Sequence, residues 1–218
     1  MAQRIFADRA EAGDLLGRQL ADLDLDDPVV LGLPRGGVVV AAHAATVLGV
    51  PADVFVARKI GLPRQPEYGV GAIAEGGDPV FELRALRVLG LQPDDLAPVV
   101  AAERVELARR VRLYRGDRAV PRVEGRTVVL VDDGIATGVT ARAALAALHA
   151  RAPARLILAA PVAAPGSLRD LEGAADEFAV LSAPIGFAAV GRWYASFPQV
   201  SEDEVISLLA TPPGRRSR

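Results

Sequence analysis

Residues 128–140 read Val-Val-Leu-Val-Asp-Asp-Gly-Ile-Ala-Thr-Gly-Val-Thr, and this stretch decides the fold. Its four apolar residues predict a buried strand, and the acids Asp132 and Asp133 follow at the carboxyl end of that strand. Two glycines and two threonines come next and lead into a helical pattern at 140–150. A strand that turns through glycines into a helix leaves backbone N–H groups free to bind a phosphate. The stretch therefore predicts a phosphate-binding loop with two carboxylates beside it.

Strand patterns alternate with helical patterns along the rest of the chain. The strand patterns lie at 29–33, 52–57, 127–131, 155–160 and 178–181, and the helical patterns at 8–23, 38–48, 92–114, 140–150, 165–173 and 202–209. This alternation predicts βαβ units with right-handed crossovers and a mostly parallel sheet. We therefore expect an α/β fold whose central sheet is flanked by helices, built as a single domain over 1–210 and followed by a flexible tail at 211–218.

The composition excludes several classes of protein and of site. Apolar residues make up 51% of the 218 residues and charged residues 24%, which is typical of a globular chain with a packed core. The net charge of −2 argues against a protein that grips nucleic acid through many phosphates. There are no cysteines and two histidines, His43 and His149, which excludes disulfides, thiolate metal sites and a multi-histidine metal centre. No apolar run has the length of a signal peptide or a membrane span, so we expect a cytoplasmic protein without a membrane partner.

A second glycine turn follows the strand predicted at 29–33. It contains Pro34, Arg35, Gly36 and Gly37. Glycines let a backbone approach an anion closely, and the planar guanidinium of Arg35 adds positive charge and N–H donors. A tight connection between a strand and a helix is the alternative interpretation of the same residues.

Two cations, Arg58 and Lys59, follow the strand predicted at 52–57, and Lys59 is the one lysine of the chain. At a strand end they would face the same cleft as the two turns, and we expect them to neutralise an anionic group there. A compact ammonium on a flexible stem can follow a departing group, which favours Lys59 over its neighbour. The alternative for Lys59 is an ordinary surface lysine.

The stretch 128–140 closely resembles the ribose-phosphate-binding signature of the type I phosphoribosyltransferases, which is four apolar residues, two acids and Gly-x-Ala-Thr-Gly-x-Thr. The resemblance covers roughly 29–194 and fits best a branch without an assigned acceptor. It implies the fold of that family, with a flexible lid loop and a small hood. It also implies transfer of the 5-phosphoribosyl group of 5-phosphoribosyl 1-diphosphate (PRPP) to a nitrogen nucleophile, such as a nucleobase, with release of diphosphate. A strand–turn–helix with solvated acids is the alternative.

The resemblance also implies roles for individual residues. Asp132 and Asp133 would hold the ribose hydroxyls. The 5-phosphate would bind the loop formed by Gly134, Ile135, Ala136, Thr137, Gly138, Val139 and Thr140. The diphosphate would bind Pro34, Arg35, Gly36, Gly37 and Lys59, with Arg58 helping to stabilise the leaving group. Mg²⁺ is the implied cofactor, held mainly by the substrate, with Asp132 and Asp133 as the side chains able to join it.

The acceptor side is implied less fully. A lid is expected at 60–77, for which a plain β-hairpin is the alternative, and a hood at 183–200 together with N-terminal elements. Phe187, Trp193 and Tyr194 are the candidates for stacking on a base, and a hydrophobic satellite core under the C-terminal helix is the alternative. Members of the family that use 6-oxopurines carry an acid where this chain has Ala136, so the resemblance implies no loop carboxylate that acts as a base toward a purine here. Adenine-type members also have alanine at this position, so purines are not excluded.

Two other functions fit the same residues. A sensor could bind PRPP without turnover, and a hydrolase on the same sheet could cleave it without an acceptor. The arginines of the helix predicted at 92–114 could pair with Glu103 and Glu106 or line the interface of a homodimer.

Overall fold

The structure is a computed structural model that describes residues 4–210; the tail predicted at 211–218 lies outside these. The helices are α1 (Arg9–Ala21), α2 (Gly36–Leu48), α3 (Leu83–Leu89), α4 (Ala97–Arg115), α5 (Val139–His149), α6 (Pro165–Asp170) and α7 (Glu202–Ala210), with short 3-10 turns η1 (Pro93–Leu96) and η2 (Val190–Trp193). The strands are β1 (Val29–Gly32), β2 (Ala52–Val54), β3 (Ala57–Leu62), β4 (Gln65–Ala74), β5 (Val80–Phe81), β6 (Thr127–Val131), β7 (Arg155–Val162) and β8 (Glu177–Ser182). Within residues 4–210, no helix is both long and apolar enough to cross a bilayer.

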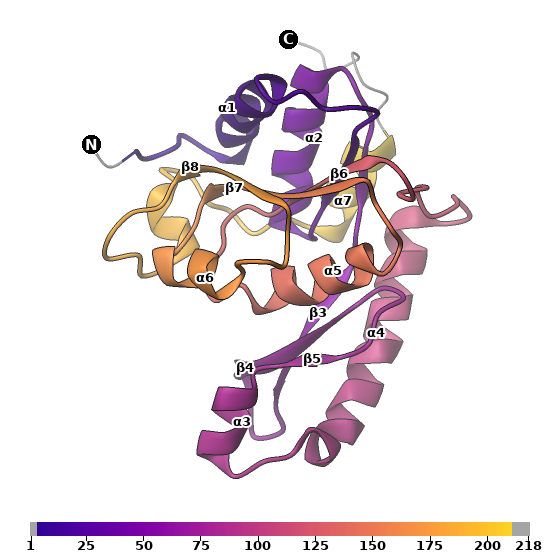
Figure 1. The fold of residues 1–218 in the computed structure, drawn as a ribbon, viewed down its shortest axis with the longest axis vertical. Coiled ribbons are helices and arrows are strands. Elements are labelled where there is room, and N and C mark those ends of the chain that lie inside the picture. The colour runs from indigo at the N-terminus through magenta and orange to yellow at the C-terminus, as the bar shows by residue number, and fades with distance from the viewer. Residues whose placement is uncertain (1–3, 211–218) are drawn as a thin grey trace.

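Five strands form the central sheet in the order β2-β1-β6-β7-β8, and every neighbouring pair is parallel. Helices α1 and α2 cover one face and α5 and α6 the other (Figure 1). Helices cover both faces of the sheet. This explains why every residue of β1 and β6 is buried and why all of them except Thr127 are apolar or glycine. The predicted α/β fold with a parallel central sheet is confirmed.

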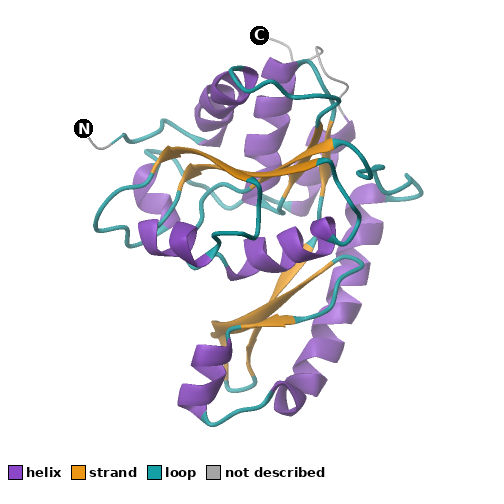
Figure 2. Cartoon of the chain, viewed as in Figure 1, coloured by secondary structure: helices purple, strands orange, loops and turns teal. Residues whose placement is uncertain are grey.

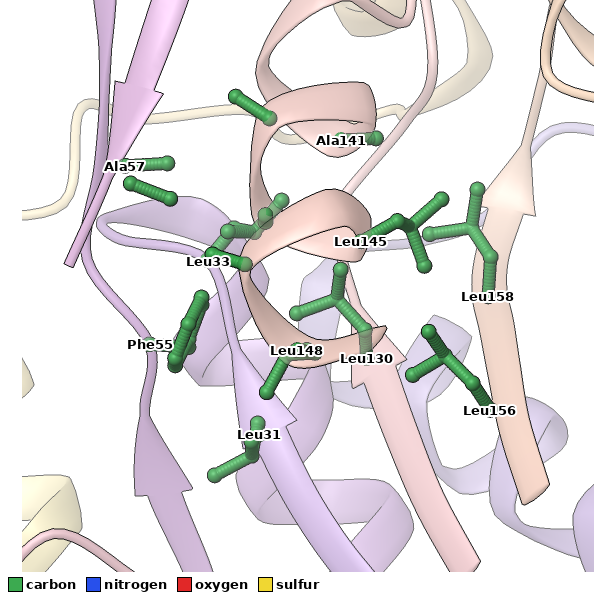
Figure 3. Packing of buried hydrophobic residues seen from close by; sticks show 14 of the residues in the cluster. Leu31, Leu33, Phe55, Ala57, Leu130, Ala141, Leu145, Leu148, Leu156 and Leu158 are labelled. Carbon is green, nitrogen blue, oxygen red and sulfur yellow. The ribbon is translucent and has the colours of Figure 1, made fainter. Parts of the chain in front are cut away.

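The larger part of the core lies between the sheet and α5 (Figure 3). Leu31, Leu130 and Leu158 come from three adjacent strands and pack against Leu145 and Leu148 of the helix. Burying a leucine stabilises a fold by about 1.5–3 kcal/mol, so this layer fixes the carboxyl ends of β1 and β6 firmly in space. Those two ends carry both glycine turns.

A second sheet lies on the far side of α5, with strand order β3-β4-β5 and antiparallel pairing (Figure 2). Ala57, Ala72 and Ala74 of this sheet join the core cluster that contains α5, and α3 and α4 border it. The segment predicted as a lid at 60–77 is therefore mainly a β-hairpin, which was the alternative interpretation.

The strand predicted at 52–57 is two strands. The Phe55 N–H donates to the carbonyl of Gly32 at 3.0 Å, and beyond this bond the chain leaves the central sheet and enters β3 at Ala57. Arg58 and Lys59 consequently lie inside a strand of the second sheet rather than at the end of a central strand.

A buried ion pair joins the two sheets. Arg115, at the end of α4, is 4% exposed and donates to Glu75 Oε1 at 3.0 Å and to the carbonyl of Val54 at 2.7 Å. Glu75 directly follows β4, and its own carbonyl accepts from Arg151 at 2.8 Å. The pair therefore holds the start of the second sheet against the edge of the first.

We expect Arg115→Met to lower the free energy of unfolding by about 3–5 kcal/mol, because it leaves the Glu75 carboxylate buried without its cationic partner. Urea denaturation measures the change. Arg112→Met, an exposed residue of the same helix, is the matched control and is expected to stay within about 0.5 kcal/mol of the parent. Equal effects of the two substitutions would contradict the role given to the pair.

Candidate active site

Hydrogen bonds to neighbouring segments fix the conformation of the loop after β6. The Ile135 N–H donates to the carbonyl of Val162 at 2.9 Å, and the Ile135 carbonyl accepts from the Ala164 N–H at 2.8 Å. The Ser167 hydroxyl donates to the carbonyl of Ala136. Gly138 has a φ of +73°, a left-handed conformation that suits glycine, and it turns the chain into α5. The carbonyls of Ile135 and Ala136 and the N–H of Ile135 are thus bonded to the rest of the protein.

A cavity of about 170 Å³ lies over this loop, and Lys59, Asp132 and residues 134–141 line it. Among the described residues, the N–H groups of Ala136, Thr137 and Gly138 have no hydrogen-bond partner. The first amides of α5 point to the same place, since the first turn of a helix leaves its N–H groups unpaired. A water occupies about 30 Å³, so the cavity has room for a phosphate group. We name it the phosphate cavity.

The two acids differ in their partners. Asp133 Oδ2 accepts from Arg9 Nε at 2.7 Å, whereas within residues 4–210 Asp132 Oδ1 accepts only from the N–H of Asp133, at 2.8 Å. Burial raises the pKa of Asp132 well above its ordinary value of 3.8, and the neighbouring Asp133 raises it further. Burial also raises the pKa of Asp133, and the Arg9 guanidinium counteracts part of that rise. Asp132 is therefore the member of the pair that needs a hydrogen-bond donor or a cation from a ligand.

The second glycine turn lies against these acids. A Cβ on Gly37 would lie 2.7 Å from the carbonyl oxygen of Val131 and 2.8 Å from Cα of Asp132, so only glycine fits there. The peptide bond between Pro34 and Arg35 is cis. A cavity of about 500 Å³ opens at this turn, which we name the turn cavity; it is lined by Arg9, Pro34, Arg35, Gly36, Asp132, Asp133, Val190, Phe197, Pro198, Gln199 and Val200.

The structure separates Arg58 from Lys59, contrary to the prediction that both face one cleft. Successive side chains of a strand point to opposite faces, and Arg58 Nε lies 2.7 Å from Glu103 Oε2 on α4. Lys59 lines the phosphate cavity, with its stem against Gly69 of β4, where a Cβ would lie 2.6 Å from Lys59 Cδ. The roles predicted for Arg58 in the site and for Lys59 at the turn are therefore corrected.

Trp193 and Tyr194 are buried rather than presented to a ligand, at 7% and 5% exposure. They pack with Phe6 of the N-terminal segment, and half-buried Phe187 stacks on Trp193 with ring centroids 6.4 Å apart. Trp193 and Tyr194 belong to a satellite core, which was the alternative interpretation, although that core lies beside α1 rather than α7. Stacking of the half-buried Phe187 on a base stays a prediction. The Tyr194 hydroxyl donates to the carbonyl of Asp133 at 2.6 Å, and burial raises its pKa.

Sequence reasoning missed the residues that form the outer wall of the turn cavity. Arg9 reaches it from the first turn of α1, and Val190, Phe197 and Gln199 reach it from the predicted hood. The Phe6 N–H donates to the carbonyl of Trp193 at 2.8 Å, so the N-terminal segment contacts the segment predicted as the hood. Nothing in the local pattern around Arg9 distinguishes it from the other arginines.

Gly36→Ala should disturb the acid pair. Its Cβ would lie 1.8 Å from Asp133 Oδ2 and 2.8 Å from Arg9 Nε, so Asp133 must move. We expect a loss of about 1–3 kcal/mol in the free energy of unfolding, the usual cost of overpacking, measured by urea denaturation. Gly166→Ala in α6 is the control, because the nearest atom to its Cβ is 3.9 Å away. A Gly36→Ala protein as stable as this control would contradict the packing described.

Asp132→Asn should increase the stability of the ligand-free protein. Because folding raises the pKa of Asp132, the folded state binds the proton more tightly, and stability is lost as the pH rises from about 4 through that raised pKa. The amide removes this loss, so we expect its melting temperature to exceed the parent's by about 2–4 °C per kcal/mol regained, more at pH 8 than at pH 5. Calorimetry at pH 5 and at pH 8 measures the melting temperatures of the variant and the parent. A difference between the two proteins that is smaller at pH 8 than at pH 5 would contradict the prediction.

Comparisons with known proteins agree with this geometry. The family model described as "Phosphoribosyl transferase domain" matches residues 4–180. The chain is 42% identical over 206 residues to "Putative phosphoribosyl transferase Rv0571c" and to "Putative phosphoribosyl transferase MT0597" from two strains of Mycobacterium tuberculosis, covering 94% of this chain and 46% of each relative. The chain thus spans about half the length of these curated relatives.

Solved structures resemble it as well. The crystal structure of TT1426 from Thermus thermophilus has 44% sequence identity and a TM-score of 0.81, with 96% of this chain and 100% of that chain covered. A hypothetical protein from Neisseria gonorrhoeae with bound ppGpp has 15% identity and a TM-score of 0.50, covers 96% of this chain and 97% of that chain, and shows the fold alone.

Proposed function

The chain belongs to the phosphoribosyl transferase domain family, and we propose that it transfers the 5-phosphoribosyl group of PRPP to a nitrogen nucleophile, with release of diphosphate. One observation carries this proposal. Asp132 lines both the phosphate cavity and the turn cavity, so the acid pair lies where the two cavities meet. A sugar with a phosphate at one end and a diphosphate at the other needs an anion site on each side of a diol site.

The residues divide between the ends of such a substrate. The free amides of Ala136, Thr137 and Gly138, with the N-terminus of α5, suit the 5-phosphate. Asp132 and Asp133 suit the ribose hydroxyls, which can donate to carboxylate oxygens. Arg35 and the amides of the second turn suit the diphosphate. Lys59, beside Asp132 in the phosphate cavity, adds positive charge from the second sheet.

In the proposed reaction the nitrogen nucleophile attacks carbon 1 of the ribose as the bond from that carbon to the diphosphate oxygen breaks. The electron pair of this bond leaves with the diphosphate, and the ribose carries positive charge in the transition state. The protein acts by holding the reactants in line and by placing fixed charges where charge develops. Asp132 and Asp133 lie on the side of the positive ribose, and Arg35 on the side of the leaving group.

Mg²⁺ fits this site as an ion carried by the substrate. No three His, Cys, Asp or Glu side chains gather into a metal-binding group anywhere in the described part of the chain. Asp132 has no cationic partner among those same residues and could join oxygen ligands from the diphosphate and the ribose. When bound, the ion would neutralise charge on the departing diphosphate.

The acceptor would approach from the outer wall of the turn cavity, which Val190, Phe197 and Gln199 form. Ala136 stands in the phosphate loop and offers no carboxylate to accept a proton from the nucleophile. The nucleophile must therefore find any proton acceptor elsewhere. The proposed acceptor is a nitrogen compound of the nucleobase class.

Three outcomes separate this proposal from its competitors. The protein is given PRPP and Mg²⁺ with a panel of nucleobases, and diphosphate release is followed together with calorimetric binding of PRPP. Release that depends on a base supports a transferase. Release without any base indicates a hydrolase, and binding without release indicates a sensor; both results would overturn the proposal.

Lys59→Ala tests the part that the second sheet plays. We expect diphosphate release to fall by about 10²–10³-fold, since the substitution removes a charge that the phosphate cavity cannot replace. Arg58→Ala is the matched control, because Arg58 points to the other face of β3 and pairs with Glu103. It should change the rate less than about threefold, as expected for a residue outside the site. Comparable losses in both variants would remove Lys59 from the proposed mechanism.

A further inference from the structure

Arg9 is a buried guanidinium that contacts the acid pair and two adjacent residues of the hood. It is 8% exposed, and charged side chains are seldom so buried unless they are paired. Its Nε lies 2.7 Å from Asp133 Oδ2, and its Nη1 donates to the carbonyl of Pro198 at 2.7 Å. Its Cζ lies 3.7 Å from the centroid of the Phe197 ring. One side chain of α1 therefore connects the acid pair to the hood.

The hood reaches Asp133 by a second route as well. The Tyr194 hydroxyl donates to the backbone carbonyl of Asp133, and the Tyr194 ring packs on Phe197 with centroids 5.0 Å apart. This route holds the backbone of Asp133. Within the described chain, only Arg9 connects the hood to the carboxylate itself, which is the part that a ligand would touch.

We propose that Arg9 is a positioning residue that couples occupancy of the Asp133 carboxylate by sugar hydroxyls to the placement of hood segment 197–200. The inference rests on the proposed function, because it requires a sugar diol at Asp133. It adds that the outer wall of the turn cavity, from which the acceptor would approach, changes its placement when the sugar binds.

The coupling follows from competition at one carboxylate. Asp133 Oδ2 already accepts from Arg9, so a hydroxyl that donates to this same oxygen shares it with the guanidinium and shifts the contact at Arg9 Nε. The guanidinium is a rigid planar fork, and a change at its Nε also displaces the Nη1 that holds Pro198 and the plane that stacks on Phe197. Coupling between two sites is reciprocal, so placement of the hood would also change the affinity for the sugar.

A purely structural role for Arg9 is the competing explanation. Attachment of the N-terminal segment to the hood, however, has its own backbone bonds. The Ala195 N–H donates to the carbonyl of Phe6 at 2.8 Å, and the Ser196 N–H donates to the carbonyl of Ala7 at 2.9 Å. These bonds do not involve the Arg9 side chain, so the hood should stay docked without it. What an Arg9 variant loses is the connection to the Asp133 carboxylate.

The test uses a fluorescent reporter on the hood. The chain has no cysteine, so Gln199→Cys provides a single thiol for an environment-sensitive dye on an exposed residue of the segment. The labelled protein is titrated with ribose 5-phosphate, and calorimetry on the same labelled protein measures binding independently of the dye. Arg9→Gln and Arg9→Lys are made in this background. Arg18→Gln, an exposed arginine of the same helix, is the control.

We expect the labelled parent and the Arg18→Gln control to show a dye response that saturates with the calorimetric isotherm. Arg9→Gln should bind ribose 5-phosphate with a Kd within about tenfold of the parent, since the phosphate cavity is intact, and should show no dye response. Arg9→Lys keeps the charge but lacks the fork, so its response should fall to about half or less. If Arg9→Gln fails to fold, the Arg9→Lys protein carries the test.

Every other outcome overturns the coupling, the positioning role of Arg9 or the proposed function. A dye response in Arg9→Gln equal to that of the parent, or none in a parent that binds the sugar, overturns the coupling and leaves the proposed function standing. Loss of all binding in Arg9→Gln would make Arg9 a ligand of the sugar phosphate rather than a positioning residue. Absence of calorimetric binding in the unlabelled native protein would overturn the proposed function and this inference with it.

Discussion

Two neighbouring half-buried carboxylates at the carboxyl end of β6 impose the constraint on which the rest of the site depends. Like charges on adjacent residues repel, and burial makes the repulsion stronger. Among the residues that the structure describes, Arg9 is the one cation that pairs with these acids. It pairs with Asp133, and Asp132 has no cationic partner. The close approach of Gly36 and Gly37 to the pair also follows, because a side chain on either glycine would collide with the acids or with their backbone. A ligand that brings hydroxyl groups or a cation would relieve what remains of the repulsion.

Much of the central layer was predictable from sequence because its signals are local. The apolar run before Asp132 predicts a buried strand, and two glycines with two threonines after it predict a turn into a helix. The same holds for the turn after β1. Both predictions depend on residues adjacent in the chain, and the structure places both turns beside the acid pair.

The errors arose where the position of a residue depends on distant parts of the chain. Arg58 and Lys59 follow an apolar run, but that run changes sheets at Phe55, which no local pattern reveals. Trp193 and Tyr194 have polar groups that favour a binding site, yet Phe6, nearly the whole chain away, covers them. Arg9 lies 124 residues from its partner Asp133, so only the fold brings the two together.

The helix α5 serves both sheets at once. Its first turn completes the phosphate cavity, and its side chains pack against the sheet that carries Lys59. The distance between Lys59 and the phosphate loop is thus set by the thickness of one helix layer rather than by the segments that touch a ligand. Small residues such as Ala144 and Ala147, which line neither the phosphate cavity nor the turn cavity, act as spacers in that layer. Substitutions that change the size of these residues could therefore change the distance between Lys59 and the phosphate loop during evolution, while every ligand-binding residue stays the same.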